Sequence, residues 1–565
     1  MDRKTLLGLG LILVIIFVWP FYIRLVSPDL PPAPAQKKTP IDTIPEARSD
    51  SSRKPITPVT DKTPIRAALA DSIVETTFAV ETTLYSAVIS NKAGGTIKQW
   101  VLKKYKDGMG EPVDFVNGKN NFERQFYYQG SPINFSSLRF NQVGNQRSVS
   151  LTDSNTHTIR YVAALSDGSQ IQIEHTFRDG VYDFETRIDW SGLRGSLGEE
   201  YRLSWQSGLV PTEKNIDGDY SYFKAYAMLG DDKEEFHNTD PTSEVSFTGV
   251  TKWMATRTKY FVLYLIPKNK MGAGCKFEGV HNTSDGHVVE QTNKLHLSMK
   301  MDRGTTDVFQ TYIGPMDYQI LGKYEGNLPI IMEWGWAVFR PLTKAILYTF
   351  QFLFGLIPNY GWVIIVFALI VKLILYPLTH KSYVGMQKMR EVMPRQKELQ
   401  KKFKDNPAKM QQELMKLYKE VGYNPLSGCL PLLIQMPILF PIYQVFGESI
   451  DLRQAHFMGW INDLSVPDTV AILHTGLPFI GDFHVNPLPI IMTALTFVQQ
   501  KFAPMTPTDD SDPAQRFNQK FLQYGMPVMF FFIFNNFSSG LVLYWTIFNV
   551  LTMLQQLLMS KHVIK

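Results

Sequence analysis

The chain of 565 residues has six long apolar runs, one at its N-terminus and five in its C-terminal part. They cover residues 6–26, 361–380, 429–448, 486–503, 522–536 and 540–559. About 20 apolar residues in a helix span a hydrocarbon core of roughly 30 Å. We therefore predict a polytopic α-helical membrane protein with six transmembrane helices.

The apolar run at residues 362–381 contains a lysine. Ten apolar residues precede Lys372, and six apolar or ring-bearing residues follow it before the chain becomes polar. Lys372 would lie about 12 Å inside the nearer interface, and the lysine stem reaches only about half that depth. A charge at such a depth costs about 2.5 to 3.5 kcal/mol on insertion scales. The ammonium either snorkels to the headgroups or faces water inside the membrane, and the stem length favours the second interpretation.

Uncharged polar residues accompany this lysine in three other spans. They are Gln435 in one span, Thr493, Thr496 and Gln500 along a face of the next, and Trp545, Asn549, Thr552 and Gln556 along a face of the last. One such stripe is compatible with ordinary interhelical hydrogen bonds worth about 0.6 kcal/mol. Three polar spans and a deep lysine together favour one shared hydrated cavity.

The N-terminal run has the features of a membrane anchor. Arg3 and Lys4 precede it, and it is longer than the apolar core of 7 to 15 residues that is typical of a cleaved secretory signal. We predict an uncleaved signal anchor over residues 1–26 with a cytoplasmic N-terminus. Residues 27–69 follow as an extended, proline-rich linker.

Residues 70–328 have the two-residue period of β-strands. One face of a single strand would carry Tyr182, Phe184, Ile188 and Trp190. Asp-Gly pairs at 167–168 and 179–180 indicate turns. The pattern predicts a large antiparallel β-sandwich.

We assign no metal site and no catalytic residue from the sequence. No CxxC, HExxH or Cys/His cluster occurs. His175 lies beside Glu174, but neighbouring residues point to opposite faces of a strand, and we interpret both as ordinary sheet surface. The membrane topology that the charges predict (next paragraph) places Cys275 and Cys429 on opposite sides of the bilayer, so we expect no disulfide between them.

Charge asymmetry predicts the topology. Residues 380–428 hold eleven Lys or Arg, whereas residues 451–486 hold only Arg453. The positive-inside rule makes the first segment cytoplasmic and the second external. The β domain would then be external and both termini cytoplasmic.

Two amphipathic segments adjoin the spans. Residues 329–357 contain Arg340, Lys344 and Gln351 at helical spacing, which predicts an interfacial helix that lies flat on the membrane. Residues 381–424 show two helical patterns separated by Asn406-Pro407, a helix-start signal, and we predict a cytoplasmic helical hairpin. Its basic surface, including Lys401, Lys402 and Lys404, predicts recruitment of substrate or ribosome.

Three motifs resemble a known family. The segments KLILYPLT (372–379), NPLSGCLPLLIQMPILFPIY (424–443) and SSGLVLYW (538–545) resemble signatures of the YidC family of membrane protein insertases, of the Gram-negative type with a large periplasmic domain. The resemblance covers the whole chain in order, from anchor to last span. It implies a multi-pass protein of the bacterial inner membrane that inserts newly made proteins into the lipid bilayer and helps them to fold, alone or with the Sec translocon and its accessory complex.

The resemblance also implies a substrate groove. A positive residue, usually arginine, stands in that groove at the position of Lys372. Tyr544 and Trp545 match an aromatic pair that contacts substrate, although tyrosine is commoner at the second position. We add Gln435, Thr496, Gln500 and Asn549 to the groove residues. The family implies no enzyme, no cofactor and no DNA partner.

Two other classes remain open at this point. One is a transporter or channel whose anionic substrate is held by Lys372, and the other is a membrane-anchored carbohydrate-active enzyme that uses the β domain. Saturable solute uptake in vesicles would indicate the first, and activity of residues 70–325 alone would indicate the second.

Overall fold

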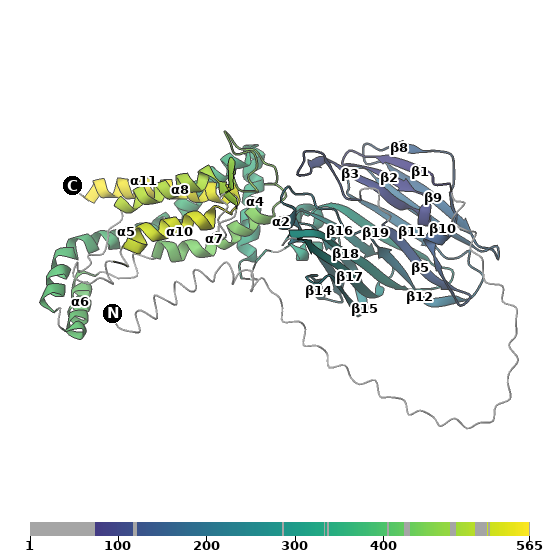
Figure 1. The fold of residues 1–565 in the computed structure, drawn as a ribbon, viewed down its shortest axis with the longest axis horizontal. Helices are drawn as coiled ribbons and strands as arrows, with labels where there is room; N and C mark the ends of the chain where they lie inside the picture. Colours follow the sequence, from purple (N-terminus) through teal and green to yellow (C-terminus); the bar gives the residue numbers. More distant parts are fainter. Residues whose placement is uncertain are drawn as a thin grey trace, which may run out of the picture.

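The computed structural model describes residues 74–116, 121–284, 287–332, 334–335, 338–403, 406–422, 430–474, 482–502, 517 and 520–563. The predicted anchor and linker, Lys404 and Cys429 lie outside these residues. Figure 1 shows a β domain on one side and a group of helices on the other, joined through α4 and the loops around it.

Two sheets form the β domain. Their strands are β1 (Thr77–Glu81), β2 (Tyr85–Ser90), β3 (Thr96–Lys106), β4 (Pro112–Asp114), β5 (Phe122–Tyr128), β6 (Ser131–Asn134), β7 (Phe140–Gln142), β8 (Ser148–Ser150), β9 (Thr156–Ala164), β10 (Gln170–Arg178), β11 (Asp183–Asp189), β12 (Leu197–Trp205), β13 (Lys224–Leu229), β14 (Asp232–Phe236), β15 (Thr242–Arg257), β16 (Phe261–Pro267), β17 (Gly272–Ser284), β18 (His287–Lys300) and β19 (Thr306–Pro315). The first sheet has the order β4-β3-β2-β1-β8. The second has the order β6-β5-β12-β18-β17-β15-β16-β19-β11-β10-β9-β7, with β13 and β14 attached to β15.

The packing of the sheets confirms the predicted sandwich, with one exception in strand direction. Trp100 of β3 donates a hydrogen bond to the Ile313 carbonyl of β19 at 3.0 Å, and its ring contacts Phe184 of β11. The predicted inward face of β11 is buried, as are the flanking residues Tyr182 and Trp190. Strand β1 pairs with β8 in parallel, whereas the other described pairs are antiparallel.

Short helical turns complete this domain. They are η2 (Lys92–Gly94), η3 (Phe135–Ser137), α2 (Ile216–Tyr220), α3 (Tyr318–Leu321) and η4 (Leu328–Ile331). Asp317 caps α3, because its carboxylate accepts hydrogen bonds from the backbone N–H groups of Gln319 and Ile320.

The C-terminal part is helical. Its elements are α4 (Arg340–Leu356), α5 (Tyr360–Lys402), α6 (Pro407–Val421), α7 (Leu430–Glu448), α8 (Pro487–Phe502), the π-helical η6 (Phe521–Gly525), α10 (Met526–Phe534) and α11 (Ser539–Val563). Helix α11 packs against α5, α7 and α8. By length and composition, residues 360–385 and 539–559 are each able to cross a membrane, and residues 523–534 form a shorter apolar helix.

Helix α5 is longer than the predicted span. It continues through Pro377 and Pro394 to Lys402, so the span and the first hairpin helix form one element of 43 residues. Helix α6 begins where the Asn406-Pro407 signal places it, and the Asn406 side chain accepts a hydrogen bond from the Lys409 N–H at 3.1 Å. The two helices contact each other as a hairpin.

Helix α4 has two apolar faces rather than one. Thr343, Ile346, Leu347, Phe350 and Leu353 are buried, and α4 packs on α5 and α7. Phe352 and Leu356 are each 67% exposed. Lys344 and Arg340 are exposed, but Gln351 donates a hydrogen bond to Asp451 and is therefore held at the domain junction.

Candidate functional site

Lys372 belongs to helix α5, and its side chain contacts helix α11. Its ammonium nitrogen donates a hydrogen bond to the Thr552 hydroxyl at 2.7 Å and lies 4.7 Å from the centre of the Phe548 ring. Thr552 and Phe548 are four residues apart, so they occupy one face of α11. A hydroxyl dipole and an aromatic ring therefore receive the positive charge.

The ammonium retains hydrogen-bonding capacity. Lysine has three N–H donors, and among the described residues Thr552 is the one hydrogen-bond acceptor of Lys372. No carboxylate pairs with Lys372 in the described part of the chain. The side chain is only 6% exposed within the chain itself, which leaves an uncompensated charge at a helix contact.

A second polar contact joins helices α7 and α11. The Gln435 amide donates a hydrogen bond to the Tyr544 hydroxyl at 3.1 Å, and both side chains are buried. The Tyr544 ring lies 6.0 Å from the rings of Phe367 and Phe548. Phe548 thus contacts both Lys372 and Tyr544, which links the two polar contacts along one side of α11.

The remaining predicted groove residues take less part in these contacts. Trp545 is half-buried and packs against the Phe534 ring at 5.4 Å. Asn549 and Gln500 are half-buried. Thr496 donates its hydroxyl hydrogen to the Met492 carbonyl of its own helix at 2.8 Å.

The structure shows two further polar contacts between helices α5 and α11, made by Thr552 and Thr379. Thr552 belongs to the polar stripe of the last span, yet its pairing with Lys372 depends on a contact across 180 positions. Thr379 accepts a hydrogen bond from the Gln555 amide at 3.4 Å. Its sequence neighbours gave no periodic signal that would have identified it.

The cytoplasmic lysines lie where helix α5 ends. Lys401 and Lys402 are exposed, and Lys404 lies outside the described residues. Lys402 and Lys409 approach the Phe403 ring at 5.6 and 5.3 Å, so basic side chains from α5 and α6 gather at the tip of the hairpin.

His175 belongs to the core, which corrects the prediction of a sheet-surface histidine. One ring nitrogen lies 2.9 Å from the Gly94 carbonyl, and the other lies 2.9 Å from the Thr186 hydroxyl. Because a carbonyl only accepts, Nε2 carries the hydrogen and Nδ1 accepts from Thr186. Burial lowers the pKa of His175 to about 3, so the imidazole is neutral and structural. Glu174 instead pairs with Arg160 at 2.7 Å.

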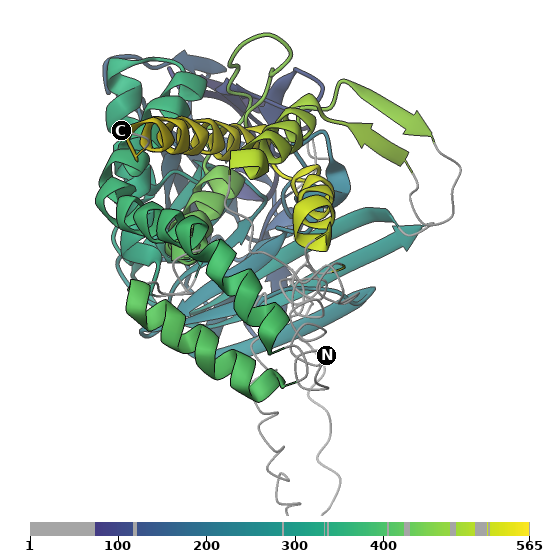
Figure 2. The same ribbon diagram turned by 90° about the vertical axis from the view of Figure 1, so that its left-hand side faces the viewer.

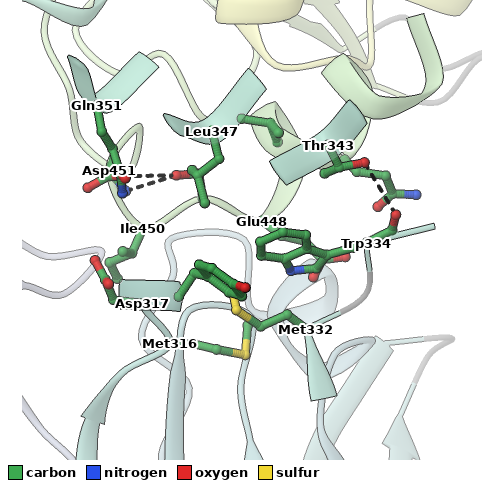
Figure 3. Close-up of a pocket in the computed structure, with 14 residues that line it drawn as sticks. Met316, Asp317, Met332, Trp334, Thr343, Leu347, Gln351, Glu448, Ile450 and Asp451 are labelled. Atoms are coloured by element: carbon green, nitrogen blue, oxygen red, sulfur yellow. Dashed lines mark hydrogen bonds between the residues drawn. The ribbon is translucent and has the colours of Figure 1, made fainter. Parts of the chain in front are cut away.

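A pocket lies at the junction of the β domain and the helices (Figure 3). The empty space between its walls, open solvent included, is about 410 Å³. The lining residues are Met316, Asp317, Tyr318, Met332, Trp334, Thr343, Leu347, Gln351, Gln444, Val445, Glu448, Ser449, Ile450 and Asp451. Burial raises the pKa of Asp451, and the Asp317 carboxylate acts in the same direction. The pocket therefore disfavours additional negative charge.

Two family models match the chain. The model described as YidC periplasmic domain matches residues 77–349, and the model described as 60Kd inner membrane protein matches residues 352–565. A membrane protein insertase of Chlorobium limicola is 35% identical over 98% of this chain and 94% of its own length. Similar proteins occur in Chloroherpeton thalassium, at 35% identity over 98% and 95% of the two chains, and in Chlorobaculum tepidum, at 32% over 99% and 95%.

These matches define the class as a membrane protein insertase of the inner membrane with a periplasmic β domain, and not an enzyme. The chain belongs to the YidC family.

Two solved structures resemble part of this chain weakly. An α-N-acetylgalactosaminidase of Bifidobacterium bifidum has a TM-score of 0.28 at 11% identity and covers 42% of this chain and 35% of its own. A GalM/aldose epimerase homologue from C. elegans has a TM-score of 0.26 at 6% identity, over 42% and 99% of the two chains. Similarity at this level carries no argument about function.

Proposed function

We propose that this insertase moves substrate tails through a hydrated groove centred on Lys372, with Gln435, Tyr544, Trp545, Asn549, Thr496 and Gln500 along its walls. The observation that supports the groove is the state of Lys372, a buried ammonium with one described hydrogen-bond acceptor and no described counter-ion. Such a charge is costly in a bilayer unless water or an acidic group reaches it. An acidic substrate tail supplies that group transiently.

The mechanism follows from the cost of crossing hydrocarbon. A polar tail that enters a groove from the cytoplasm crosses a thinner apolar layer than one that enters lipid directly. Lys372 attracts acidic groups of the tail, and reduced local dielectric strengthens that attraction. The apolar segment of the substrate then moves into lipid, driven by burial of roughly 25 cal/mol per Å². No nucleotide is required for these steps.

We further propose six spans, with both termini cytoplasmic and the β domain periplasmic. The ribosome would meet the basic tip of the α5–α6 hairpin, and the Sec translocon with its accessory complex would act beside the insertase on a subset of nascent membrane proteins. The charge difference between residues 380–428 and 451–486 supports this orientation.

Substitution of Lys372 tests the groove by separating charge from shape. Lys372→Arg should retain insertion, because positive charge and length remain. Lys372→Glu should reduce insertion most for substrates with acidic tails, since attraction becomes repulsion, and Lys372→Leu should affect those same substrates. The measurement is protease protection of the translocated tail in proteoliposomes, with a strongly apolar substrate as control.

Normal insertion of acidic-tailed substrates by a stable Lys372→Leu protein would contradict the proposal. Thr552→Val is the matched variant, because it removes the acceptor at 2.7 Å and keeps the charge. It should affect substrate insertion much less than Lys372→Glu does.

A further inference from the structure

A two-stranded ribbon extends from the junction between α7 and α8. It consists of β20 (Ala471–His474) and β21 (Asp482–Val485), paired antiparallel as a sheet of their own. All four residues of β20 are exposed, and the exposed fractions of Ile472 and Leu473 are 47% and 54%. The neighbouring Val470 is 53% exposed. A short ribbon thus presents apolar side chains that nothing in the described chain covers.

The base of the ribbon is fixed to the helices. The Asn535 amide, in the turn after α10, donates a hydrogen bond to the His484 carbonyl at 3.0 Å. The Phe483 ring lies 6.3 Å from the Phe531 ring of α10. Helix α8 begins at Pro487, two residues after β21 ends. The ribbon is therefore held at the end of α8 and α10 that faces the β domain.

The ribbon leaves the bundle sideways. Figure 2 shows the two light-green arrows extending away from the helices. Exposed apolar side chains also occur on the supporting helices, namely Ile490 and Ile491 near the start of α8 and Phe532 near the end of α10. In an inner-membrane protein exposed apolar side chains on spanning helices meet lipid, and the ribbon is attached to the ends of two such helices.

Backbone hydrogen bonding limits how deep the ribbon lies. A two-stranded ribbon has two open edges whose N–H and C=O groups need partners, and the hydrocarbon core supplies none. Water alone leaves the ribbon only marginally stable and its apolar side chains exposed. The headgroup layer satisfies both requirements, because it offers acyl chains on one side and polar groups on the other.

We propose that the β20–β21 ribbon lies in the headgroup layer of the leaflet next to the β domain and sets the depth of the start of α8. The partner is the lipid surface itself. Its strands contain no Lys or Arg, so contact depends on apolar burial and not on anionic lipid.

A fluorescent probe tests this placement in the full-length protein in lipid nanodiscs. Cys429→Ser removes one cysteine, and Cys275 is buried with a thiol pKa raised to about 12, so it does not take the label. Leu473→Cys introduces the cysteine that carries an environment-sensitive dye, and the quencher is a spin label on the lipid headgroup or in the middle of the acyl chain. Val143 is the control, because it is 52% exposed and hydrogen-bonds to β9, which Figure 1 places far from the helices.

Quenching of the Leu473 probe by the headgroup label should exceed quenching of the Val143 probe several-fold, in neutral as well as anionic lipid. The headgroup label should also quench more than the mid-chain label. Equal quenching at both positions would place the ribbon in water, and stronger mid-chain quenching would place it in hydrocarbon. Either result would overturn the proposal. The quenching measurement does not depend on insertion activity. Its result therefore tests the ribbon independently of the proposed Lys372 groove.

Discussion

Arg453 and Glu213 form a buried ion pair between the helical part and the β domain, with 2.7 Å between Nε and Oε1. Arg453 lies in the loop after α7, and its guanidinium also donates to the Thr212 carbonyl and contacts the Phe261 ring. A second pair joins Arg257 of β15 to Glu448 at the end of α7, at 3.6 Å. Two ion pairs therefore dock the β domain at the C-terminal end of α7. The helical part supplies the cation of one pair, and the β domain supplies the cation of the other.

We predict that Arg453→Met loosens this docking. Removing one partner of a buried pair leaves an uncompensated charge, at a cost of about 3–5 kcal/mol. The double variant Arg453→Met/Glu213→Gln should recover part of that loss. The distribution of distances between spin labels at positions 143 and 356 should be broader in the single variant than in the unsubstituted protein. It should narrow again in the double variant. An unchanged distance distribution in the single variant would show that other contacts hold the β domain in place without this ion pair.

Docking in the Arg453→Met protein should also depend on pH. Burial raises the pKa of Glu213, and Arg453 opposes that rise. Without Arg453, the folded pKa rises further above the ordinary value. The docked state then gains stability as pH falls through the raised pKa, because the neutral acid is buried at lower cost. The same distance measurement at pH 5 and pH 8 should show tighter docking at pH 5, and the double variant should show no such difference.

The stability of the β domain should fall on acidification because of His175. Its folded pKa of about 3 lies below the ordinary value of 6.5, so the unfolded chain binds more protons between these values. The free energy of unfolding should therefore decrease by up to about 1.4 kcal/mol per pH unit across that window. Hydrogen exchange of β10 amides, corrected for intrinsic rates, measures this slope. His175→Gln should reduce it, and an unchanged slope would assign the acid sensitivity to other groups.

The Gln435–Tyr544 hydrogen bond should contribute modestly to bundle stability. We expect a coupling of about 0.6 kcal/mol in a double-mutant cycle of Gln435→Leu and Tyr544→Phe, the average for polar contacts between membrane helices. Thermal unfolding in bicelles gives the four values required. Additive effects of the two substitutions would mean that the contact is energetically neutral.

Charge reversal at the hairpin tip should weaken ribosome association. Lys401→Glu, Lys402→Glu and Lys404→Glu together remove attraction to ribosomal RNA, and the dependence of binding on salt should become shallower. Co-sedimentation across a range of salt concentrations measures both quantities. The triple Lys→Arg variant keeps the charge and should bind as before. Equal binding by the Glu and Arg variants would leave the hairpin a structural role only.

Sequence patterns predicted the elements whose structure depends on interactions within one segment of the chain. The two-residue period of β11 predicted its buried face, because successive side chains on a strand point to opposite sides. Asn406-Pro407 predicted the start of α6, because the cap and the fixed proline φ act within one turn. The apolar runs predicted the helices α7, α8, α10 and α11 closely, since hydropathy is a property of the segment alone.

Contacts between distant segments required the tertiary structure. The sequence by itself determined that Lys372 is a charge within a long apolar helix and that strands dominate the described chain between residues 77 and 315. It could not determine that Thr552 receives the ammonium, that Arg453 pairs with the β domain, or that His175 is buried against the η2 turn. Hydropathy and periodicity act within a segment, whereas each of these outcomes depends on which surface of another element packs against it.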